Sequence, residues 1–252
     1  MSDRSTIEWT EATWNPVTGC TEVSPGCDNC YARTFAERFR GVPGHPYEQG
    51  FDLKLWPARL EQPDRWKKPR TIFVNSMSDL FHEDVPIAYI SQVFDAMAAA
   101  PHHTYQVLTK RPGRMASVVR QLRPQPLPQV WLGTSIELDK YTWRAEKLRQ
   151  TPAAVRFLSL EPLLGPLPSL ELHGLDWVIV GGESGHGARP LEAEWVRDLR
   201  DRCAAQGVAF FFKQTGAVWA RELGYRSKGT DAEEIPDEFL VRQYPERQLI
   251  TA

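Results

Sequence analysis

The chain has 252 residues, of which 42% are hydrophobic and 25% charged, and its net charge at neutral pH is −2. This composition supports a full hydrophobic core and excludes a largely disordered protein. The small negative charge gives no general attraction to nucleic acid, although it does not exclude a local basic groove. No apolar run approaches the roughly 18 residues that a transmembrane helix needs, so we expect no membrane span.

The chain begins with a predicted short strand over residues 8–13, and a loop rich in cysteine follows it over residues 14–33. Three of the four cysteines lie in this loop, at Cys20, Cys27 and Cys30, with the spacing C-x6-C-x2-C. Three thiolates leave the fourth iron of a [4Fe–4S] cluster open to a small molecule, whereas structural zinc usually has four protein ligands. Because C-x2-C is also typical of zinc sites, spacing alone leaves both metals open.

Apolar residues at helical spacing predict a helix over residues 31–40. Residues 41–70 contain many prolines and glycines, and we interpret them as an excursion over the mouth of a barrel, held down by Trp56 and Trp66. The segment 65–70 is a basic run that could form an edge for nucleic acid or simply a solvated face. From residue 71 onward, apolar strand-like segments alternate with amphipathic helices. The predicted strands cover residues 71–75, 104–109, 130–135, 155–159, 177–181 and 209–213, and the predicted helices contain residues 90–97, 115–122, 138–148 and 192–206.

This alternation is typical of parallel strands joined by helical crossovers. We therefore predict an α/β fold, a single-domain partial or irregular (β/α) barrel of parallel strands over residues 1–216. The connection 162–176 lacks an evident helix, which makes the repeat irregular. Residues 217–252 are predicted to be a C-terminal extension that packs on the same domain. Cys203 falls on the apolar stripe of the last predicted helix and is expected to be a buried residue remote from the other cysteines.

Polar residues follow each predicted strand, which is where (β/α) barrels assemble their active sites. The candidates on this rim are Ser76, Ser78, Asp79, Lys110, Ser135, Glu137, Glu161, Gly181, Gly182, Glu183 and Lys213. An alternative is that each cluster only caps the following helix. A hydrolase that uses Glu161 and Glu183 would need the two carboxylates paired at a suitable separation.

The cysteine loop resembles that of the radical SAM superfamily, and within it the branch that includes spore photoproduct lyase. There N-P-x-x-G-C precedes the loop and C-Y-A-R closes it, as residues 15–20 and 30–33 do here. The usual spacing in the superfamily is C-x3-C-x2-C, so this chain has three extra residues between its first two cysteines. The whole chain, over residues 8–216, also resembles a phage-associated family with the longer spacing, through the segments NSMSDLFH, LTKRP, LSLEPLLGP, VIVGGESG and FKQTG.

The resemblance implies a [4Fe–4S] cluster on Cys20, Cys27 and Cys30, with S-adenosyl-L-methionine at its open iron. By strand order it assigns cofactor binding to Ser76, Ser78, Asp79, Ser135 and Glu137. Gly181 and Gly182 would let the backbone approach the cofactor closely. From their places on the rim we predict catalytic roles for Lys110, Glu161, Glu183 and Lys213. Lys110, Arg111 and Lys213 could meet a carboxylate or a phosphate. The resemblance also implies an electron donor such as flavodoxin or ferredoxin, and nucleic acid or a nucleotide as the substrate. We expect a cytoplasmic location with reduced thiols and no disulfide, because the sequence shows no signal peptide. The alternative function is a non-catalytic metal-binding protein, in which zinc or an iron–sulfur cluster only staples the N-terminal loop.

Overall fold

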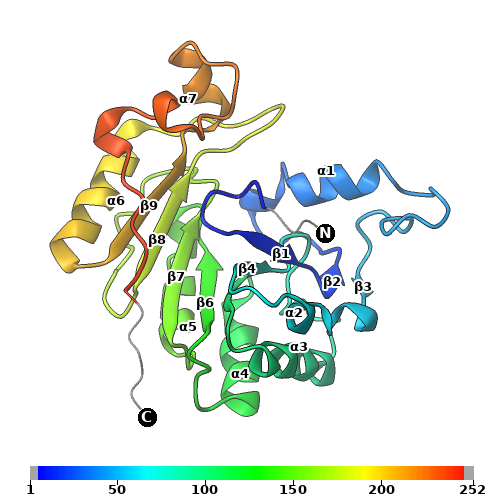
Figure 1. The fold of residues 1–252 in the computed structure, drawn as a ribbon. Coiled ribbons are helices and arrows are strands. Elements are labelled where there is room, and N and C mark those ends of the chain that lie inside the picture. Colours follow the sequence, from blue (N-terminus) through cyan, green and yellow to red (C-terminus); the bar gives the residue numbers. More distant parts are fainter. Residues whose placement is uncertain (1–4, 247–252) are drawn as a thin grey trace. The chain divides into compact units, whose positions relative to one another are not determined.

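The computed structural model describes residues 5–246. Seven strands form one sheet in the order β1-β4-β5-β6-β7-β8-β9 (Figure 1), and the pairings of β1 with β4, β4 with β5, β7 with β8 and β8 with β9 are parallel. The order of the strands in the sheet is their order along the chain, which is the topology of a (β/α) barrel. The predicted α/β fold with a partial barrel of parallel strands is therefore confirmed.

The elements follow the predicted alternation. The strands of the main sheet are β1 (Ala12–Trp14), β4 (Thr71–Val74), β5 (Thr104–Thr109), β6 (Val130–Ser135), β7 (Val155–Leu160), β8 (Trp177–Gly181) and β9 (Ala209–Gln214). A small antiparallel sheet pairs β2 (Val17–Thr18) with β3 (Lys54–Leu55). The α-helices are α1 (Tyr31–Glu37), α2 (Gln62–Arg65), α3 (Ile87–Ala99), α4 (Pro112–Leu122), α5 (Trp143–Arg149), α6 (Ala193–Gln206) and α7 (Gly216–Glu222).

Three predicted elements differ from the structure. The helix predicted over residues 31–40 ends at Glu37. The first strand begins at Ala12 rather than at residue 8, because residues 5–11 form turns in which the Thr10 amide donates to the Ile7 carbonyl (3.1 Å). Trp9, in these turns, packs against Phe73, with the two ring centroids 4.7 Å apart. The predicted helix over residues 138–148 is divided into a 3-10 turn, Asp139–Tyr141, and the shorter α5.

Contacts divide the chain into two compact units, and the boundary falls within β6. The first unit contains residues 1–132 and 151–154 and includes β1, β4 and β5. Helix α3 buries the predicted apolar stripe of Ile90, Val93, Phe94 and Met97. Helix α4 buries Met115, Val118 and Val119, whereas Leu122, the last residue of its predicted stripe, is only half-buried. Burial of each such side chain stabilises the fold by about 1.5–3 kcal/mol relative to exposure.

The excursion over residues 41–70 also belongs to the first unit, and it carries short elements of its own. Trp56 anchors it: the indole donates to the Thr18 hydroxyl (2.8 Å), and the cations of Lys54 and Arg59 lie 4.1 and 4.0 Å from its ring. The basic run 65–70 leads into β4 at Thr71. It therefore lies at the amino end of that strand, away from the carboxyl end where the candidate site residues begin.

The second unit contains residues 133–150 and 155–252 and includes β7, β8 and β9. Along α6, Val196, Leu199 and Cys203 form the buried stripe, and Cys203 has no solvent exposure. Burial raises the pKa of the Cys203 thiol to about 12, so it behaves as the small apolar residue that the sequence predicted. After β9, the described part of the C-terminal extension packs in this unit, where Phe239 contacts the ring of Trp219.

Candidate active site

The cysteine loop is attached to the carboxyl end of β4. The Gly19 amide donates to the Met77 carbonyl (3.0 Å), and the Met77 amide donates to the side-chain oxygen of Asn15 (2.9 Å). The Ser78 hydroxyl donates to the Val17 carbonyl (2.8 Å). Because β1 and β4 are parallel neighbours, the loop lies at their carboxyl ends, which is the edge where the sequence placed the site.

Gly19 shows why the segment before the first cysteine needs a glycine. Its φ is +84°, and an added Cβ would lie 2.2 Å from the backbone oxygen of Asp52. The next amide, that of Cys20, donates to the Phe51 carbonyl (3.3 Å), so the chain passes close to residues 51–52 on both sides of this turn. The glycine and Asn15 of N-P-x-x-G-C therefore fix the path of the loop.

The three loop thiols are free and partly exposed. Cys20 and Cys30 both pack against the buried cluster of Ala32, Ala36 and Phe51. Burial raises the pKa of the Cys20 thiol to about 11; the nearby charges of Asp79 and Cys27 add to that rise, while Arg111 opposes it. Cys30 immediately precedes α1, as the helical pattern after the loop predicted.

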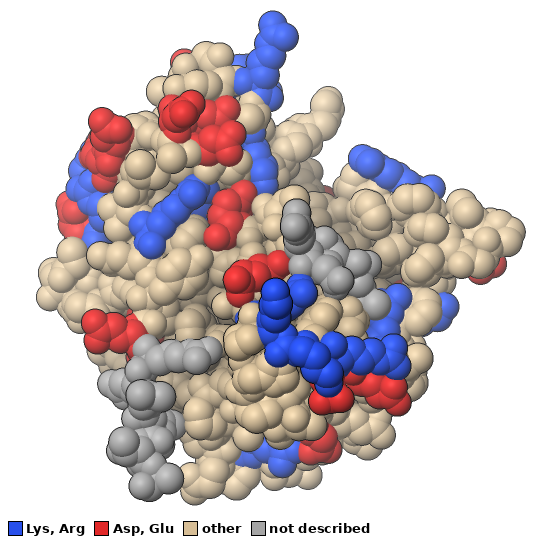
Figure 2. Space-filling view, in the orientation of Figure 1, with Lys and Arg blue, Asp and Glu red and all other residues tan. Residues whose placement is uncertain are grey.

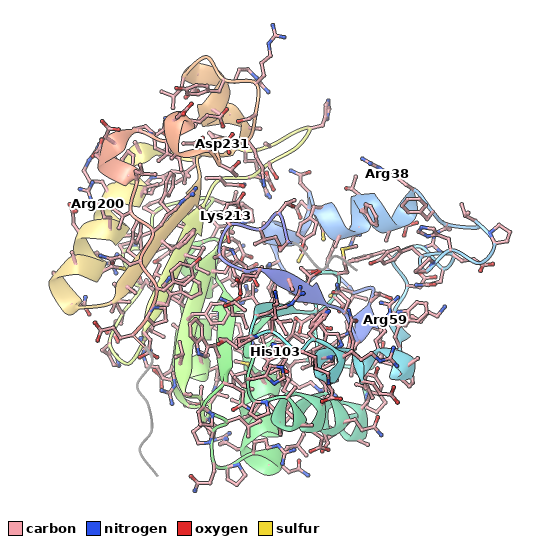
Figure 3. All side chains as sticks on the ribbon, viewed as in Figure 1. Arg38, Arg59, His103, Arg200, Lys213 and Asp231 are labelled. Atoms are coloured by element: carbon pink, nitrogen blue, oxygen red, sulfur yellow. The ribbon has the colours of Figure 1, made fainter. Side chains whose placement is uncertain are left out.

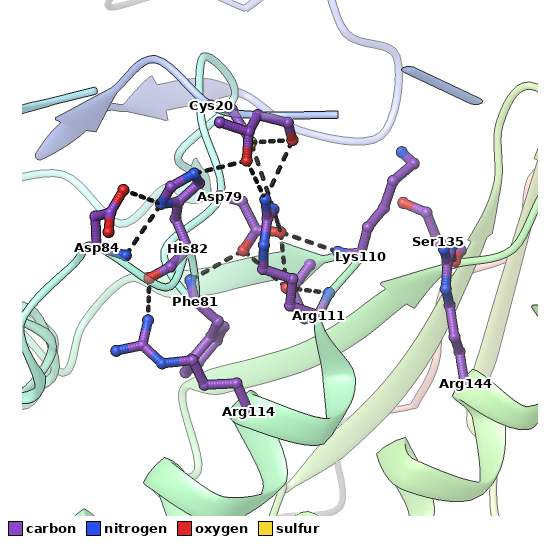
Figure 4. A network of polar contacts seen from close by, with 12 residues as sticks. Cys20, Asp79, Phe81, His82, Asp84, Lys110, Arg111, Arg114, Ser135 and Arg144 are labelled. Carbon is purple, nitrogen blue, oxygen red and sulfur yellow. Dashed lines mark hydrogen bonds and ion pairs between the residues drawn. The ribbon is translucent and has the colours of Figure 1, made fainter. Parts of the chain in front are cut away.

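Asp79 is the centre of the polar network in the first unit (Figure 4). Its carboxylate accepts hydrogen bonds from the Thr109 hydroxyl (2.7 Å), the Phe81 amide (2.9 Å) and the Lys110 amide (3.1 Å). It also forms an ion pair with Arg111 at 3.1 Å, in which both side chains are largely buried. The network ties the loop after β4 to the loop after β5.

Arg111 carries the network on to the cysteine loop. One guanidinium nitrogen lies 3.5 Å from the Cys20 sulfur, and the other donates to the Thr21 carbonyl (3.1 Å) and hydroxyl (2.9 Å). The Thr21 hydroxyl also pairs with a ring nitrogen of His82 (2.9 Å). Burial lowers the pKa of His82, and the positive charge of Arg111 lowers it further.

Among the predicted cofactor-binding residues of this unit, three have their polar groups occupied by the protein itself. The Ser76 hydroxyl pairs with the Asn15 side chain, the Ser78 hydroxyl bonds to Val17, and Asp79 is the centre of the network described above. Lys110, for which a catalytic role was predicted, differs, because its Nζ has no hydrogen-bond or ion-pair partner among residues 5–246 and its side chain extends away from Asp79 (Figure 4).

In the second unit, Glu161 and Lys213 form an ion pair of 3.0 Å at the ends of β7 and β9 (Figure 3 labels Lys213). Both side chains are mostly buried. Gly181, at the end of β8, makes room for this pair, since an added Cβ would lie 2.8 Å from a Glu161 carboxylate oxygen. Three of the predicted rim residues are thus brought together.

The neighbouring rim residues form two more ion pairs. Glu137 is fully buried and pairs with Arg144 (3.0 Å), and Arg144 also donates to the Ser135 carbonyl (2.9 Å). Glu183 accepts two hydrogen bonds from the Arg189 guanidinium, at 2.6 and 2.9 Å. The two carboxylates considered for a hydrolase, Glu161 and Glu183, are thus each paired with a different cation, Lys213 and Arg189.

Gly182 follows β8 and lies against the chain after β9. An added Cβ would lie 2.2 Å from the Thr215 carbonyl oxygen, and the Gly182 carbonyl accepts from the Gln214 side chain (2.7 Å). This glycine is therefore required by close packing of the protein's own backbone. The rim residues of the two units were predicted to line one cavity with the cysteines, and that stays a prediction.

The donor chemistry of the loop fits an iron–sulfur cluster, because three unpaired, partly exposed thiols lie on one short segment. Within residues 5–246, however, no group of three His, Cys, Asp or Glu side chains is arranged to hold a metal ion. The assignment of Cys20, Cys27 and Cys30 as cluster ligands stays a prediction. Cys203 belongs to the core of α6 and is fully buried.

Sequence reasoning missed how much the site depends on arginine. Arg144 gave no signal, because its buried partner lies seven residues away across a turn. Arg111 lies in the LTKRP segment and was considered only for a ligand's carboxylate or phosphate. Its contact with Cys20, 91 residues away, depends on the tertiary fold.

Solved structures of spore photoproduct lyase share this fold. A cysteine-to-serine mutant of that lyase matches with a TM-score of 0.50 and 14% identity, over 79% of this chain and 62% of the lyase chain. A mutant with bound AdoMet and dinucleoside spore photoproduct matches with a TM-score of 0.47 and 12% identity, over 79% and 64%. The chain thus spans less than two thirds of the lyase chains.

No curated protein matches the chain in sequence. Among the helices of residues 5–246, none has the length and apolar character to cross a membrane. A family model described as "Protein of unknown function (DUF5131)" matches residues 4–245, which is nearly the whole chain. The chain therefore belongs to the DUF5131 family.

Proposed function

We propose that this protein is an iron–sulfur enzyme of the radical S-adenosylmethionine type, with Cys20, Cys27 and Cys30 as the ligands of a [4Fe–4S] cluster. The observation that carries the proposal is the cysteine loop itself, which has the sequence ends of the spore photoproduct lyase branch and is fastened to the carboxyl ends of β1 and β4. The likeness of the fold to that lyase supports it.

The residues of this chain would then have separate roles in the reaction. Once bound, the cluster supplies the electron that breaks the sulfonium C–S bond of S-adenosylmethionine. Lys110 is our candidate for the methionine carboxylate, because its ammonium has no partner among the described residues. Asp79 and Ser78 hold the loops in place, and Glu161 with Lys213 forms the ionised pair proposed to act on the substrate.

The proposal includes a cytoplasmic location and an electron donor such as flavodoxin or ferredoxin. It also includes a nucleic acid or nucleotide as substrate, in keeping with the branch that the cysteine loop resembles. On the face drawn in Figure 2, blue Lys and Arg side chains form one contiguous band with red Asp and Glu side chains beside it, and most of the face is tan.

The test is reconstitution of the full chain with iron and sulfide in the absence of oxygen. We expect about four iron and four labile sulfide per chain, and 5′-deoxyadenosine from S-adenosylmethionine when dithionite is added. C27S should bind no cluster, and C203S is the matched control that should bind it fully. Zinc without labile sulfide, together with intact S-adenosylmethionine, would contradict the proposal and favour the non-catalytic metal-binding alternative.

A further inference from the structure

We propose that Arg111 is a positioning residue for Cys20 and that its guanidinium donates an N–H···S hydrogen bond which raises the reduction potential of the cluster. This inference rests on the proposed function. The contact joins one guanidinium nitrogen to the Cys20 sulfur at 3.5 Å. Within residues 5–246, no guanidinium contacts the sulfur of Cys27 or Cys30, so the three thiols are not equivalent.

Contacts with residues other than Cys20 hold the Arg111 side chain in place. The nitrogen that faces Cys20 also faces a carboxylate oxygen of Asp79, 3.1 Å away. The Arg111 amide donates to the Thr109 hydroxyl (2.8 Å), and that hydroxyl donates to Asp79 in turn. The side chain is 13% exposed, so water competes weakly for its donors. A donor fixed in this way loses little conformational entropy when it bonds to sulfur.

The other branch of the guanidinium fixes the chain next to Cys20. It donates to both the carbonyl and the hydroxyl of Thr21, at 3.1 and 2.9 Å. A lysine has a single ammonium and could not bond to Asp79, Cys20 and Thr21 in the same fork geometry. The three contacts therefore require the planar guanidinium of arginine, and a positive charge alone would not reproduce them.

The electrochemical consequence follows from the charge of the cluster. Reduction adds one electron, supplied by dithionite in the assay, and makes the cluster and its thiolates more negative. A hydrogen bond to a ligand sulfur stabilises this reduced state more than the oxidised state, and hydrogen bonds to the sulfurs are among the factors that set cluster potentials. Removal of the Arg111 donor should therefore make the cluster harder to reduce.

The test compares reconstituted wild-type protein with R111M, R111K and R114M. Arg114 is the matched control, because it lies in α4, which begins directly after Arg111, and donates to the His82 and Val85 carbonyls but contacts no cysteine within residues 5–246. The midpoint potential is measured by mediated dithionite titration, followed by the EPR signal of the reduced cluster. Circular dichroism confirms that each variant is folded.

For R111M we expect the ratio of reduced to oxidised cluster at a fixed potential to fall about tenfold, which is ~59 mV for a one-electron couple. R111K should shift in the same direction although it keeps the charge, and R114M should match the wild type. Folded R111M that loses its cluster while R111K retains a lowered potential would equally support the positioning role.

An unchanged potential in R111M would overturn the inference. A lowered potential in R111M together with a wild-type potential in R111K would also overturn it. The positive charge, without the hydrogen bond, would then explain the change in potential. If the wild-type protein itself binds no cluster, the proposed function fails and the inference fails with it. This outcome is distinguished at once, because it is seen before any variant is compared.

Discussion

Replacement of Asp79 by alanine is the sharpest test of the network that joins the loops after β4 and β5. The carboxylate accepts from Thr109, Phe81, Lys110 and Arg111, and its side chain is 7% exposed. Loss of one partner of a buried ion pair costs roughly 3–5 kcal/mol, because the remaining charge stays buried without compensation. We therefore expect D79A to lower the free energy of unfolding by about that amount.

Urea denaturation followed by circular dichroism measures the effect. With a slope of ~2 kcal/mol per molar urea, a loss of ~3 kcal/mol moves the midpoint down by about 1.5 M. The double variant D79A/R111M removes both charges, so its cost should be smaller than the sum of the single variants by roughly 0.5–3 kcal/mol. A midpoint shift below about 0.5 M in D79A, or strictly additive costs, would refute the reasoning.

Three further predictions concern the loop and its surroundings. C27S should abolish iron binding and C203S should retain it, as measured by metal analysis after anaerobic reconstitution; equal metal contents would contradict the assigned ligands. Gly19→Ala should destabilise the protein far more than Gly44→Ala. Both residues have positive φ, but a Cβ at Gly19 would lie 2.2 Å from backbone, whereas nothing lies within 4 Å of a Cβ at Gly44. Calorimetry measures the loss of stability, and equal losses in the two variants would rule out the steric explanation. The pKa of His82 is lowered in the folded protein by burial and by Arg111, so stability that is present above the unfolded pKa of about 6.5 should be lost as pH falls below it. H82Q should flatten that part of the pH–stability curve, and an unchanged slope would assign the dependence to another group.

The fold could be predicted from the sequence where local patterns carry the information. The boundaries of β5, β6 and β8 were predicted at the residues where the structure has them, because each is an apolar run that ends at a polar cluster. Residues 8–11 were placed in the first strand but form turns, whereas residues 12 and 13 do belong to it. The hydrogen bond that closes the turn, from the Thr10 amide to the Ile7 carbonyl, leaves no pattern in the sequence.

The candidate site was predicted as positions on a rim, but its internal contacts were not. Ser78 was expected to face a cofactor, and its hydroxyl instead bonds to Val17, 61 residues away in the sequence. Thr109 and Asp79 are separated by 30 residues and meet only when β4 and β5 pair. Sequence spacing therefore identifies which polar residues reach the strand ends, whereas tertiary pairing decides which of them hold the scaffold and which keep free groups.

The chain after β9 has a consequence for how the molecule behaves in a crowded solution. β9 is the last strand in the sheet order, and its run of three phenylalanines would make an exposed edge attractive to other unpaired strands. The Phe212 amide instead donates to the Val241 carbonyl (2.8 Å), and the Gln243 amide donates to the Phe210 carbonyl (2.9 Å). Residues 241–243 thus cover the free edge of β9 and oppose self-association. A chain shortened before Val241 would expose this edge and should aggregate more readily.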